Sequence, residues 1–319
     1  MSKLFSLKPI SRRMTRRQEG HDYRLPGRYM ITLSCCHPRP QLSMLGGTPR
    51  KPELQLTELG ERIAQMIVTF PEYHRELTVP AYVIMPDHVH FLVDVKKTMN
   101  RDLGCYIGAL KGACSRQWSE CEGRDNVIPL FEDGFHDRII RDDRQYETVT
   151  NYIADNPRRL LIKRLRPELF HTYNHLNIGN REMAAYGNIF LLRDFQKMQV
   201  RIHRAWSSED LDDHRRKALD CIAAGGVLVS PFIHQWEKEI RNEAIEAGGR
   251  IITLRSDGFE DRFKPWGRDF ELCQEGRLLL LAPWPENNDD ILTRSTALSL
   301  NDIAAELAAS DYSDSLSLK

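Results

Sequence analysis

The chain of 319 residues lacks any long hydrophobic run and lacks an N-terminal apolar segment of the kind that a signal peptide contains. A membrane-spanning helix needs about 18 or more consecutive apolar residues, and no stretch approaches that length. The seven cysteines are odd in number and include no Cys-x-x-Cys pair, so they do not read as a disulfide framework. We therefore expect a cytoplasmic protein whose cysteines are reduced thiols.

The chain also lacks net charge, but the formal value of +0 hides an asymmetry. Residues 1–170 hold 27 basic against 21 acidic side chains, a formal charge of +6, and the remainder holds 18 against 24, or −6. Such runs are commonly solvated faces. The basic residues that we predict to contact a nucleic-acid backbone are Arg12, Arg13, Arg16, Arg17, Arg158, Arg159 and Lys163.

A histidine pair stands inside a segment that is otherwise typical of a strand. His88 and His90 alternate there with Val89 and Phe91. Because successive side chains of a strand point to opposite faces, both imidazoles project from one face and can converge on a cation. The valine and phenylalanine give the opposite face an apolar surface to bury, and the histidine face is expected to stay open. A His-x-His pair alone is equally compatible with two hydrogen-bonded histidines that bind no metal.

A helix is predicted about sixty residues further on, because Tyr146, Val149 and Ile153 recur at helical spacing. Tyr152 falls on the flank of that buried stripe, and Asn156 lies one turn beyond it on the same face. The alternative interpretation is structural: an aromatic ring at the edge of the core, and an amide that ends a helical turn before a proline.

Two motifs in this order, Met-Pro-Asp-His-Val-His at 85–90 and Tyr-Ile-x-x-Asn-Pro at 152–157, resemble the HUH single-strand transposases. The closest likeness is to the REP-associated tyrosine transposases, and it covers roughly residues 20–170. The resemblance implies that His88, His90 and Asn156 are metal ligands and that Tyr152 is the nucleophile. Two imidazoles and an amide oxygen, with phosphate completing the shell, are compatible with Mg²⁺ or Mn²⁺ and do not exclude Zn²⁺. The resemblance further implies nicking and rejoining of single-stranded DNA, on hairpin or repeat elements, through a 5′-phosphotyrosine intermediate.

The chemistry is consistent with that implication. A phenol has a pKa near 10 and is a poor nucleophile at neutral pH, so attack on a phosphodiester needs an electrophile polarised by a cation. Two other interpretations stay open. One is a DNA-binding or regulatory protein of transposase ancestry that no longer cuts DNA. The other is a nucleotide hydrolase of the histidine-triad kind, which fits poorly because Leu92 stands where a further alternating histidine is needed. The sequence does not distinguish a monomer from a homodimer.

Local patterns predict the fold class of the first domain, residues 1–170. A strand at 28–36 is followed by a helix at 59–70 that Pro71 ends, then by paired strands around 77–85 and 88–95. A helix over 103–114, a strand near 137–141 and the helix that carries Tyr152 complete the order. This β-α-β-β-α-β-α order predicts a ferredoxin-like α+β domain with helices on one face, which agrees with the HUH fold that the resemblance implies.

The rhythm changes after a connecting stretch around 167–185. Strands at 198–203, 227–229, 250–254 and 277–282 alternate with helices at 208–224, 235–247 and 293–309. That alternation predicts a Rossmann-like α/β domain with a parallel sheet over residues 185–319. No Gly-x-Gly-x-x-Gly fingerprint is present, which disfavours a dinucleotide site.

This second half, over about residues 185–310, loosely resembles the nucleotide-binding fold of the DNA-processing protein A group. Ligands of open parallel sheets sit beyond the carboxyl ends of strands, so Ser230, Thr293 and Arg294 are the predicted nucleotide or phosphate contacts. A strand-to-helix turn and a helix cap would explain the same residues. The domain is interpreted either as a second grip on single-stranded DNA or as a module that binds a small ligand or a partner.

Overall fold

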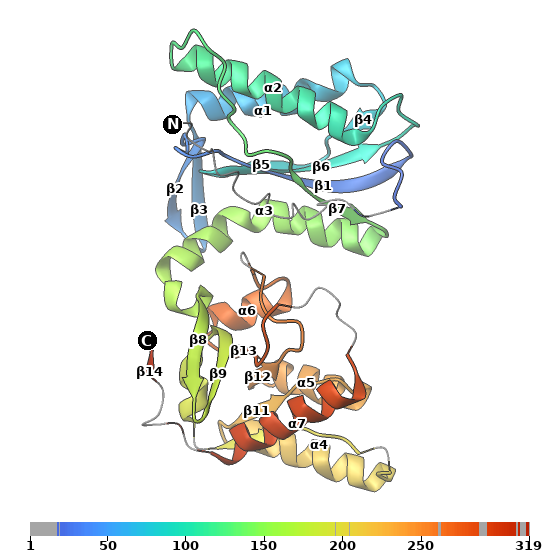
Figure 1. Ribbon diagram of the computed structural model, residues 1–319, viewed down its shortest axis with the longest axis vertical. Helices are drawn as coiled ribbons and strands as arrows, with labels where there is room; N and C mark the ends of the chain where they lie inside the picture. The colour runs from blue at the N-terminus through green and yellow to red at the C-terminus, as the bar shows by residue number, and fades with distance from the viewer. Residues whose placement is uncertain are drawn as a thin grey trace, which may run out of the picture. The chain divides into compact units, whose positions relative to one another are not determined.

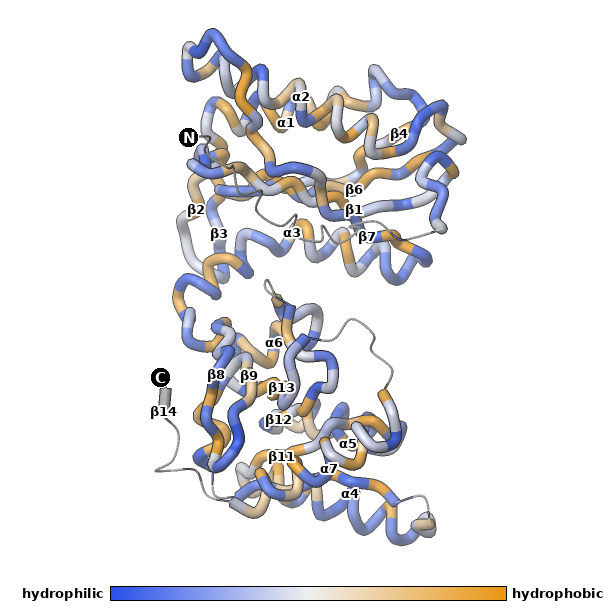
Figure 2. Tube along the Cα trace, in the orientation of Figure 1, coloured by the Kyte–Doolittle hydropathy of each residue, from blue (hydrophilic) through white to orange (hydrophobic). Residues whose placement is uncertain are grey.

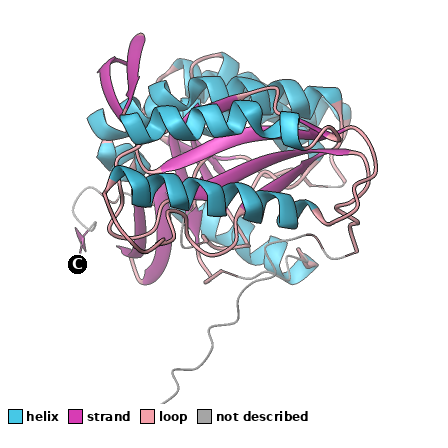
Figure 3. Cartoon of the chain, turned by 90° about the horizontal axis from the view of Figure 1, so that it is seen from above, coloured by secondary structure: helices cyan, strands magenta, loops and turns pink. Residues whose placement is uncertain are grey.

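The computed structural model describes residue 18 and residues 20–194, 196–203, 205–260, 263–286, 292–310, 312 and 317–318. The chain divides into two compact units, Met1–Ile162 and Lys163–Lys319. Figure 1 labels their helices and strands, and Figure 3 colours them by type.

The first unit is built on an antiparallel sheet. The strand order is β4-β6-β1-β7, and β5 also pairs with β6. The strands are β1 (Gly27–Ser34), β4 (Leu77–Thr78), β5 (Tyr82–Ile84), β6 (His88–Val95) and β7 (His136–Ile140). The α+β class and the element order predicted for these strands match the structure.

Helices cover both faces of this sheet, not one. The helices α1 (Glu58–Tyr73) and α2 (Leu103–Cys121) pack on one face, and α3 (Asp143–Leu165) lies along the other, as Figure 1 shows. Val89, Phe91 and Val93 of β6 share a buried core with residues of α1 and α2. The histidine face, expected to stay open, is therefore the face that α3 covers.

Both prolines that were expected to mark the end of a helical turn lie inside helices. Pro71 is within α1 and Pro157 within α3, which continues to Leu165. Each proline removes one backbone hydrogen bond. The residue before each proline, Phe70 in α1 and Asn156 in α3, is buried, which is consistent with packing that stabilises both helices at these positions.

An antiparallel hairpin that the sequence did not predict follows β1. It consists of β2 (Ser43–Thr48) and β3 (Lys51–Leu56). Gly47 has φ 79°, and a Cβ there would lie 2.3 Å from the carbonyl oxygen of Lys51, so this turn requires glycine. Most residues of the hairpin are at least partly exposed, which explains the absence of an alternating apolar signal.

The second unit contains a mixed sheet of order β10-β11-β12-β13-β9-β8-β14. The four strands β10 to β13 are parallel, while β9, β8 and β14 are joined antiparallel. The strands are β8 (Thr172–Ile178), β9 (Arg181–Gly187), β10 (Lys197–Gln199), β11 (Val227–Ser230), β12 (Arg250–Leu254), β13 (Leu278–Ala282) and β14 (Ser317–Leu318). The stretch 167–185, interpreted as a connection, thus supplies most of a β-hairpin.

Helices lie on both faces of this second sheet. One buried cluster unites the sheet with α4 (Ser208–Ala223), α5 (Gln235–Glu246) and α6 (Arg268–Gln274), and another unites it with α7 (Arg294–Ala309). Short 3₁₀ turns occupy Pro167–Phe170 and Ile189–Arg193. The parallel strands follow one another in chain order, without the reversal that creates the ligand crevice of a Rossmann sheet. The four strands predicted to be parallel are parallel, but the antiparallel β8, β9 and β14 make the sheet mixed, and the Rossmann-like fold is not confirmed.

Candidate active site

The two histidines open β6 and lie on one side of the sheet. Their ring centres are 4.6 Å apart, with an angle of 73° between the ring planes. Strand alternation accounts for this, since Val89 between them belongs to the opposite core. His90 is only 6% exposed, whereas His88 is half-buried. The predicted convergence of the two imidazoles is thus present in the fold.

A hydrogen bond fixes the Nδ1 side of each imidazole. Nδ1 of His88 lies 2.7 Å from Oδ1 of Asp87, and Nδ1 of His90 lies 2.8 Å from the hydroxyl of Thr32 on β1. Because a carboxylate only accepts, His88 donates from Nδ1, which makes Nε2 its nitrogen for a cation. Asp87 is itself held by Arg39 at 3.2 Å. Such outer partners orient metal-binding histidines.

The ring of Tyr152 lies next to this pair. Its centre is 5.6 Å from that of His90. The helix α3 brings it there by burying Val149 and Ile153, which are 0% and 1% exposed, against the sheet. Figure 2 shows α3 as mostly hydrophilic with short hydrophobic patches, the pattern of a helix that buries one stripe. Residues of β6 and α3 that are about sixty positions apart in sequence therefore form one site.

Opposing effects act on the Tyr152 hydroxyl. Burial raises the pKa of Tyr152 above its ordinary value, while the positive charge of Arg159 and a hydrogen bond from Asn156 lower it. The guanidinium carbon of Arg159 lies 5.2 Å from the centre of the Tyr152 ring, and Arg159 is only 8% exposed. This buried cation favours the phenolate form that a nucleophile needs.

Asn156 belongs to the same cluster. It is 7% exposed, and its Nδ2 donates to the carbonyl oxygen of Tyr152 at 2.8 Å. Its Oδ1 is the atom that would ligate a cation, since the amide nitrogen only donates.

Histidine and asparagine are residue types that can ligate a divalent cation, with a phosphate oxygen completing its shell. Within the described ranges, no group of three or more His, Cys, Asp and Glu side chains is placed to hold a metal ion. The predicted ligands His88, His90 and Asn156 would offer two imidazole nitrogens and one amide oxygen. Imidazole suits zinc and related transition metals, whereas magnesium prefers oxygen, so this set does not select one metal.

The predicted DNA-binding residues are placed differently from one another. Arg158 forms an ion pair with Asp155, with contacts of 2.6 and 2.9 Å. Lys163 belongs to the second unit, where its Nζ lies 5.8 Å from the ring centre of Phe170 and 5.7 Å from that of Phe270. The four arginines Arg12, Arg13, Arg16 and Arg17 lie outside the described residues.

The predicted ligand residues of the second unit have structural partners. The hydroxyl of Ser230 is buried and accepts from the backbone nitrogen of Phe232 at 2.9 Å. Thr293 is the N-cap of α7 and accepts from the nitrogen of Thr296, and Arg294 is exposed in the first turn. A ligand role for Ser230, Thr293 and Arg294 stays a prediction.

The N-terminus of α5, another helix at the carboxyl edge of the parallel strands, is already occupied by a carboxylate side chain of the protein. The buried carboxylate of Glu237 accepts from the backbone nitrogens of Ile202, Ile233 and His234 at 2.8 to 3.0 Å. A phosphate at this helix N-terminus would meet that negative charge, so the edge beside Ser230 does not favour an anionic ligand.

Sequence reasoning missed two residues of the first unit's site, Thr32 and Arg39. Both act on the histidines from before β6, one directly and one through Asp87. No spacing rule connects Thr32 with His90, 58 positions later, because only the pairing of β1 with β6 makes them neighbours.

Comparison with known proteins finds a family match over most of the first unit. Residues 50–156 match the model of the family described as "Transposase IS200 like". That segment contains His88, His90, Tyr152 and Asn156. The resemblance to transposases that the two motifs predicted is therefore confirmed as a match to this family over residues 50–156.

The individual relatives are distant. A protein of Haemophilus influenzae described only as uncharacterised is 23% identical over 168 residues, which are 46% of this chain and 89% of that protein. A solved REP-associated tyrosine transposase bound to a REP hairpin is 20% identical, with a TM-score of 0.31 over 44% of this chain and 73% of its own. A candidate transposase of Deinococcus radiodurans R1 is 16% identical, with a TM-score of 0.28 over 44% and 97%.

None of the described helices is long and apolar enough to cross a membrane.

Proposed function

We propose that the first unit nicks and rejoins single-stranded DNA, with Tyr152 as nucleophile, at hairpin or repeat elements. The observation that carries the proposal is the placement of the Tyr152 ring 5.6 Å from His90, with His88 beside it and Arg159 over the phenol. The match to the IS200-like family supports the class of reaction. A DNA-binding protein that no longer cuts DNA is the alternative that the experiment below separates.

In the proposed reaction the Tyr152 oxygen forms a bond to phosphorus while the bond from phosphorus to the 3′-oxygen breaks. The phenol proton is lost to solvent, and the leaving 3′-oxygen gains a proton to become a free hydroxyl. The phosphotyrosine linkage retains a phosphodiester bond, so attack by a 3′-hydroxyl on the same phosphorus reverses the step and joins the strands.

Each residue has a stated part in that step. Arg159 stabilises the phenolate, and Asn156 orients Tyr152 through its hydrogen bond. His88 and His90 would hold Mg²⁺, Mn²⁺ or another divalent cation through Nε2, with Asn156 Oδ1 as third ligand. When bound, such a cation acts as a Lewis acid on the non-bridging phosphate oxygen and orients the leaving 3′-oxygen.

The proposal is tested with hairpin oligonucleotides that carry randomised single-stranded flanks and a label at either end. With Mn²⁺, a 3′-labelled strand should form an adduct that survives denaturation, because the tyrosine retains the downstream fragment. A 5′-labelled strand should yield a free shortened product instead. Chelation by EDTA should abolish both products, and added Mn²⁺ should restore them.

Two matched variants separate nucleophile from scaffold. Tyr152→Phe should form no adduct, whereas Tyr146→Phe, six residues earlier on the same helix, should still form it. An adduct that persists in Tyr152→Phe would refute the nucleophile. DNA binding without any adduct in the wild type would support the alternative of a non-cutting DNA-binding protein.

For the second unit we propose that Arg294 and the α7 terminus contact either DNA phosphate or a small anionic ligand. Support comes from the exposure of Arg294 at a helix N-terminus. Arg294→Gln in the full chain should weaken oligonucleotide binding if the unit grips DNA. An unchanged oligonucleotide affinity would contradict a DNA contact at Arg294 and favour the small anionic ligand.

A further inference from the structure

A polar row crosses three strands of the first unit, on the same side of the sheet as the histidines. Asp94 of β6 is paired across the strands with Thr78 of β4 and with Arg28 of β1. Directly paired residues of antiparallel strands project to the same face. Asp94 is four residues after His90, so it faces α3 as His90 does, about 13 Å further along the strand.

Two neighbouring polar atoms of this row are buried without partners. Asp94 is 5% exposed; its Oδ2 accepts from Lys96 at 2.9 Å, but its Oδ1 has no hydrogen-bond partner in the part of the chain that the structure describes. The hydroxyl oxygen of Thr78, a half-buried residue, is also buried and has no hydrogen-bond partner there. A buried carboxylate oxygen without a donor is costly, and ordinary packing does not remove that cost.

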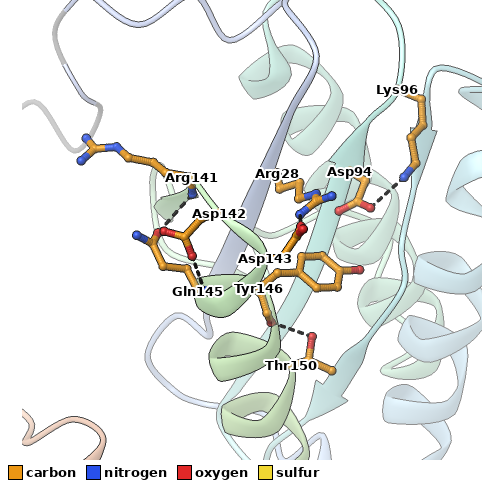
Figure 4. A network of polar contacts seen from close by, with 9 residues as sticks. All are labelled: Arg28, Asp94, Lys96, Arg141, Asp142, Asp143, Gln145, Tyr146 and Thr150. Atoms are coloured by element: carbon orange, nitrogen blue, oxygen red, sulfur yellow. Dashed lines mark hydrogen bonds and ion pairs between the residues drawn. The ribbon is translucent and has the colours of Figure 1, made fainter.

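Exposed side chains frame these two atoms. Lys96 is 54% exposed and Arg28 is 42% exposed, so both can move toward solvent. Figure 4 shows the Asp94 carboxylate between them, with the Tyr146 ring beside the group. Arg28 lies 4.8 Å from the centre of that ring and pairs with Asp143 at 2.5 Å. Tyr146, Arg28 and Lys96 therefore place an aromatic ring and two cations around the buried acceptor oxygen of Asp94.

We propose that Asp94 and Thr78 form a subsite for the edge of a nucleobase that carries an amino group beside an unprotonated ring nitrogen. Asp94 Oδ1 accepts from the exocyclic amine, and the Thr78 hydroxyl donates to the ring nitrogen. Cytosine and adenine present this pattern; uracil and thymine present a carbonyl beside an N–H and so place an acceptor against the carboxylate.

The subsite deepens the proposed function and rests on it, because the base belongs to a nucleotide near the phosphate at Tyr152. The separation from His90 along β6 is within the reach of a strand of a few nucleotides. Lys96 releases Asp94 as the base enters, and Arg28 remains on Tyr146. The specificity of this unit would then include direct reading of one base by side chains of the sheet.

The test compares the binding of two oligonucleotides of twelve nucleotides, oligodeoxycytidine (dC12) and oligodeoxyuridine (dU12). Cytosine has an amine beside an unprotonated ring nitrogen, where uracil has a carbonyl beside an N–H. Fluorescence anisotropy at fixed salt, in the Tyr152→Phe background, measures affinity without cutting. This protein should bind dC12 about tenfold more tightly than dU12. Adding Asp94→Asn should bring the ratio close to one, because the Asn amide can donate to uracil as well as accept from cytosine.

Two further variants serve as a control and as a second test of the subsite. Asp143→Asn removes a carboxylate from the same Arg28 but leaves the buried acceptor, and should keep the tenfold ratio. Thr78→Val should weaken dC12 binding several-fold, and it carries the test if Asp94→Asn fails to fold. A ratio that is unchanged in Asp94→Asn, equally lost in Asp143→Asn, or absent from the parent protein would overturn the subsite. If neither oligonucleotide binds, the single-stranded DNA function itself fails.

Discussion

The guanidinium of Arg159 lies over the ring of Tyr152, seven residues earlier on α3, with 5.2 Å between the guanidinium carbon and the ring centre. Both groups are largely withdrawn from water, so their interaction is less screened than a surface pair would be. The positive charge of Arg159 therefore lies where it can stabilise the phenolate form of Tyr152.

Removing that charge should shift the titration of Tyr152. Arg159→Gln leaves burial, which raises the pKa of Tyr152, without its main opposing effect, so the pKa should rise further. A raised pKa means less phenolate at any pH below it, and the pH profile of adduct formation should move to higher pH. Tyrosinate absorbance, taken as the difference from Tyr152→Phe, measures the shift. Arg158→Gln, whose arginine pairs with Asp155, is the control and should leave the titration in place.

The hydrogen bond between Thr32 and His90 should matter for metal affinity. Thr32→Val keeps the shape of the side chain but removes the hydroxyl that lies 2.8 Å from Nδ1. Loss of such an orienting partner typically lowers metal affinity about 10- to 100-fold. Titration calorimetry with Mn²⁺ gives the value without any DNA. Thr148→Val, on the exposed side of α3, should bind Mn²⁺ as the wild type does; equal affinities for both variants would contradict the assigned role of Thr32.

DNA affinity should depend steeply on salt. For single strands the slope of log K against log salt is about −0.7 per neutralised phosphate. If Arg158 contacts a phosphate, Arg158→Gln should reduce the slope by about 0.7. Arg62→Gln, on α1 at the opposite face of the sheet, removes an exposed arginine paired with Glu58 and should not change the slope. A flat salt dependence in the wild type would count against backbone recognition.

The sequence predicted those parts of the fold that have local causes. Alternation placed His88 and His90 on one face, and helical spacing placed Tyr152 beside the buried stripe of Val149 and Ile153; the structure has both. The meeting of strand and helix came from the family resemblance, because nothing local links positions that are sixty residues apart.

Other parts could not be predicted, because they depend on pairing in three dimensions. Thr32 reaches His90 only through the register of β1 with β6. The location of α3 opposite α1 and α2 follows from which strand face each helix buries, and the element order does not specify that. The hairpin at 43–56 is mostly exposed and therefore carries no alternating signal.

The measurement that tests the central claim most directly is the identity of the tyrosine that carries DNA. Trypsin should release Gln145 to Arg158 as one peptide, and this peptide contains both Tyr146 and Tyr152. After reaction with a hairpin oligonucleotide and nuclease trimming, fragmentation by mass spectrometry should place the 5′-phosphonucleotide on Tyr152. Attachment to Tyr146, or to a tyrosine outside this peptide, would contradict the account.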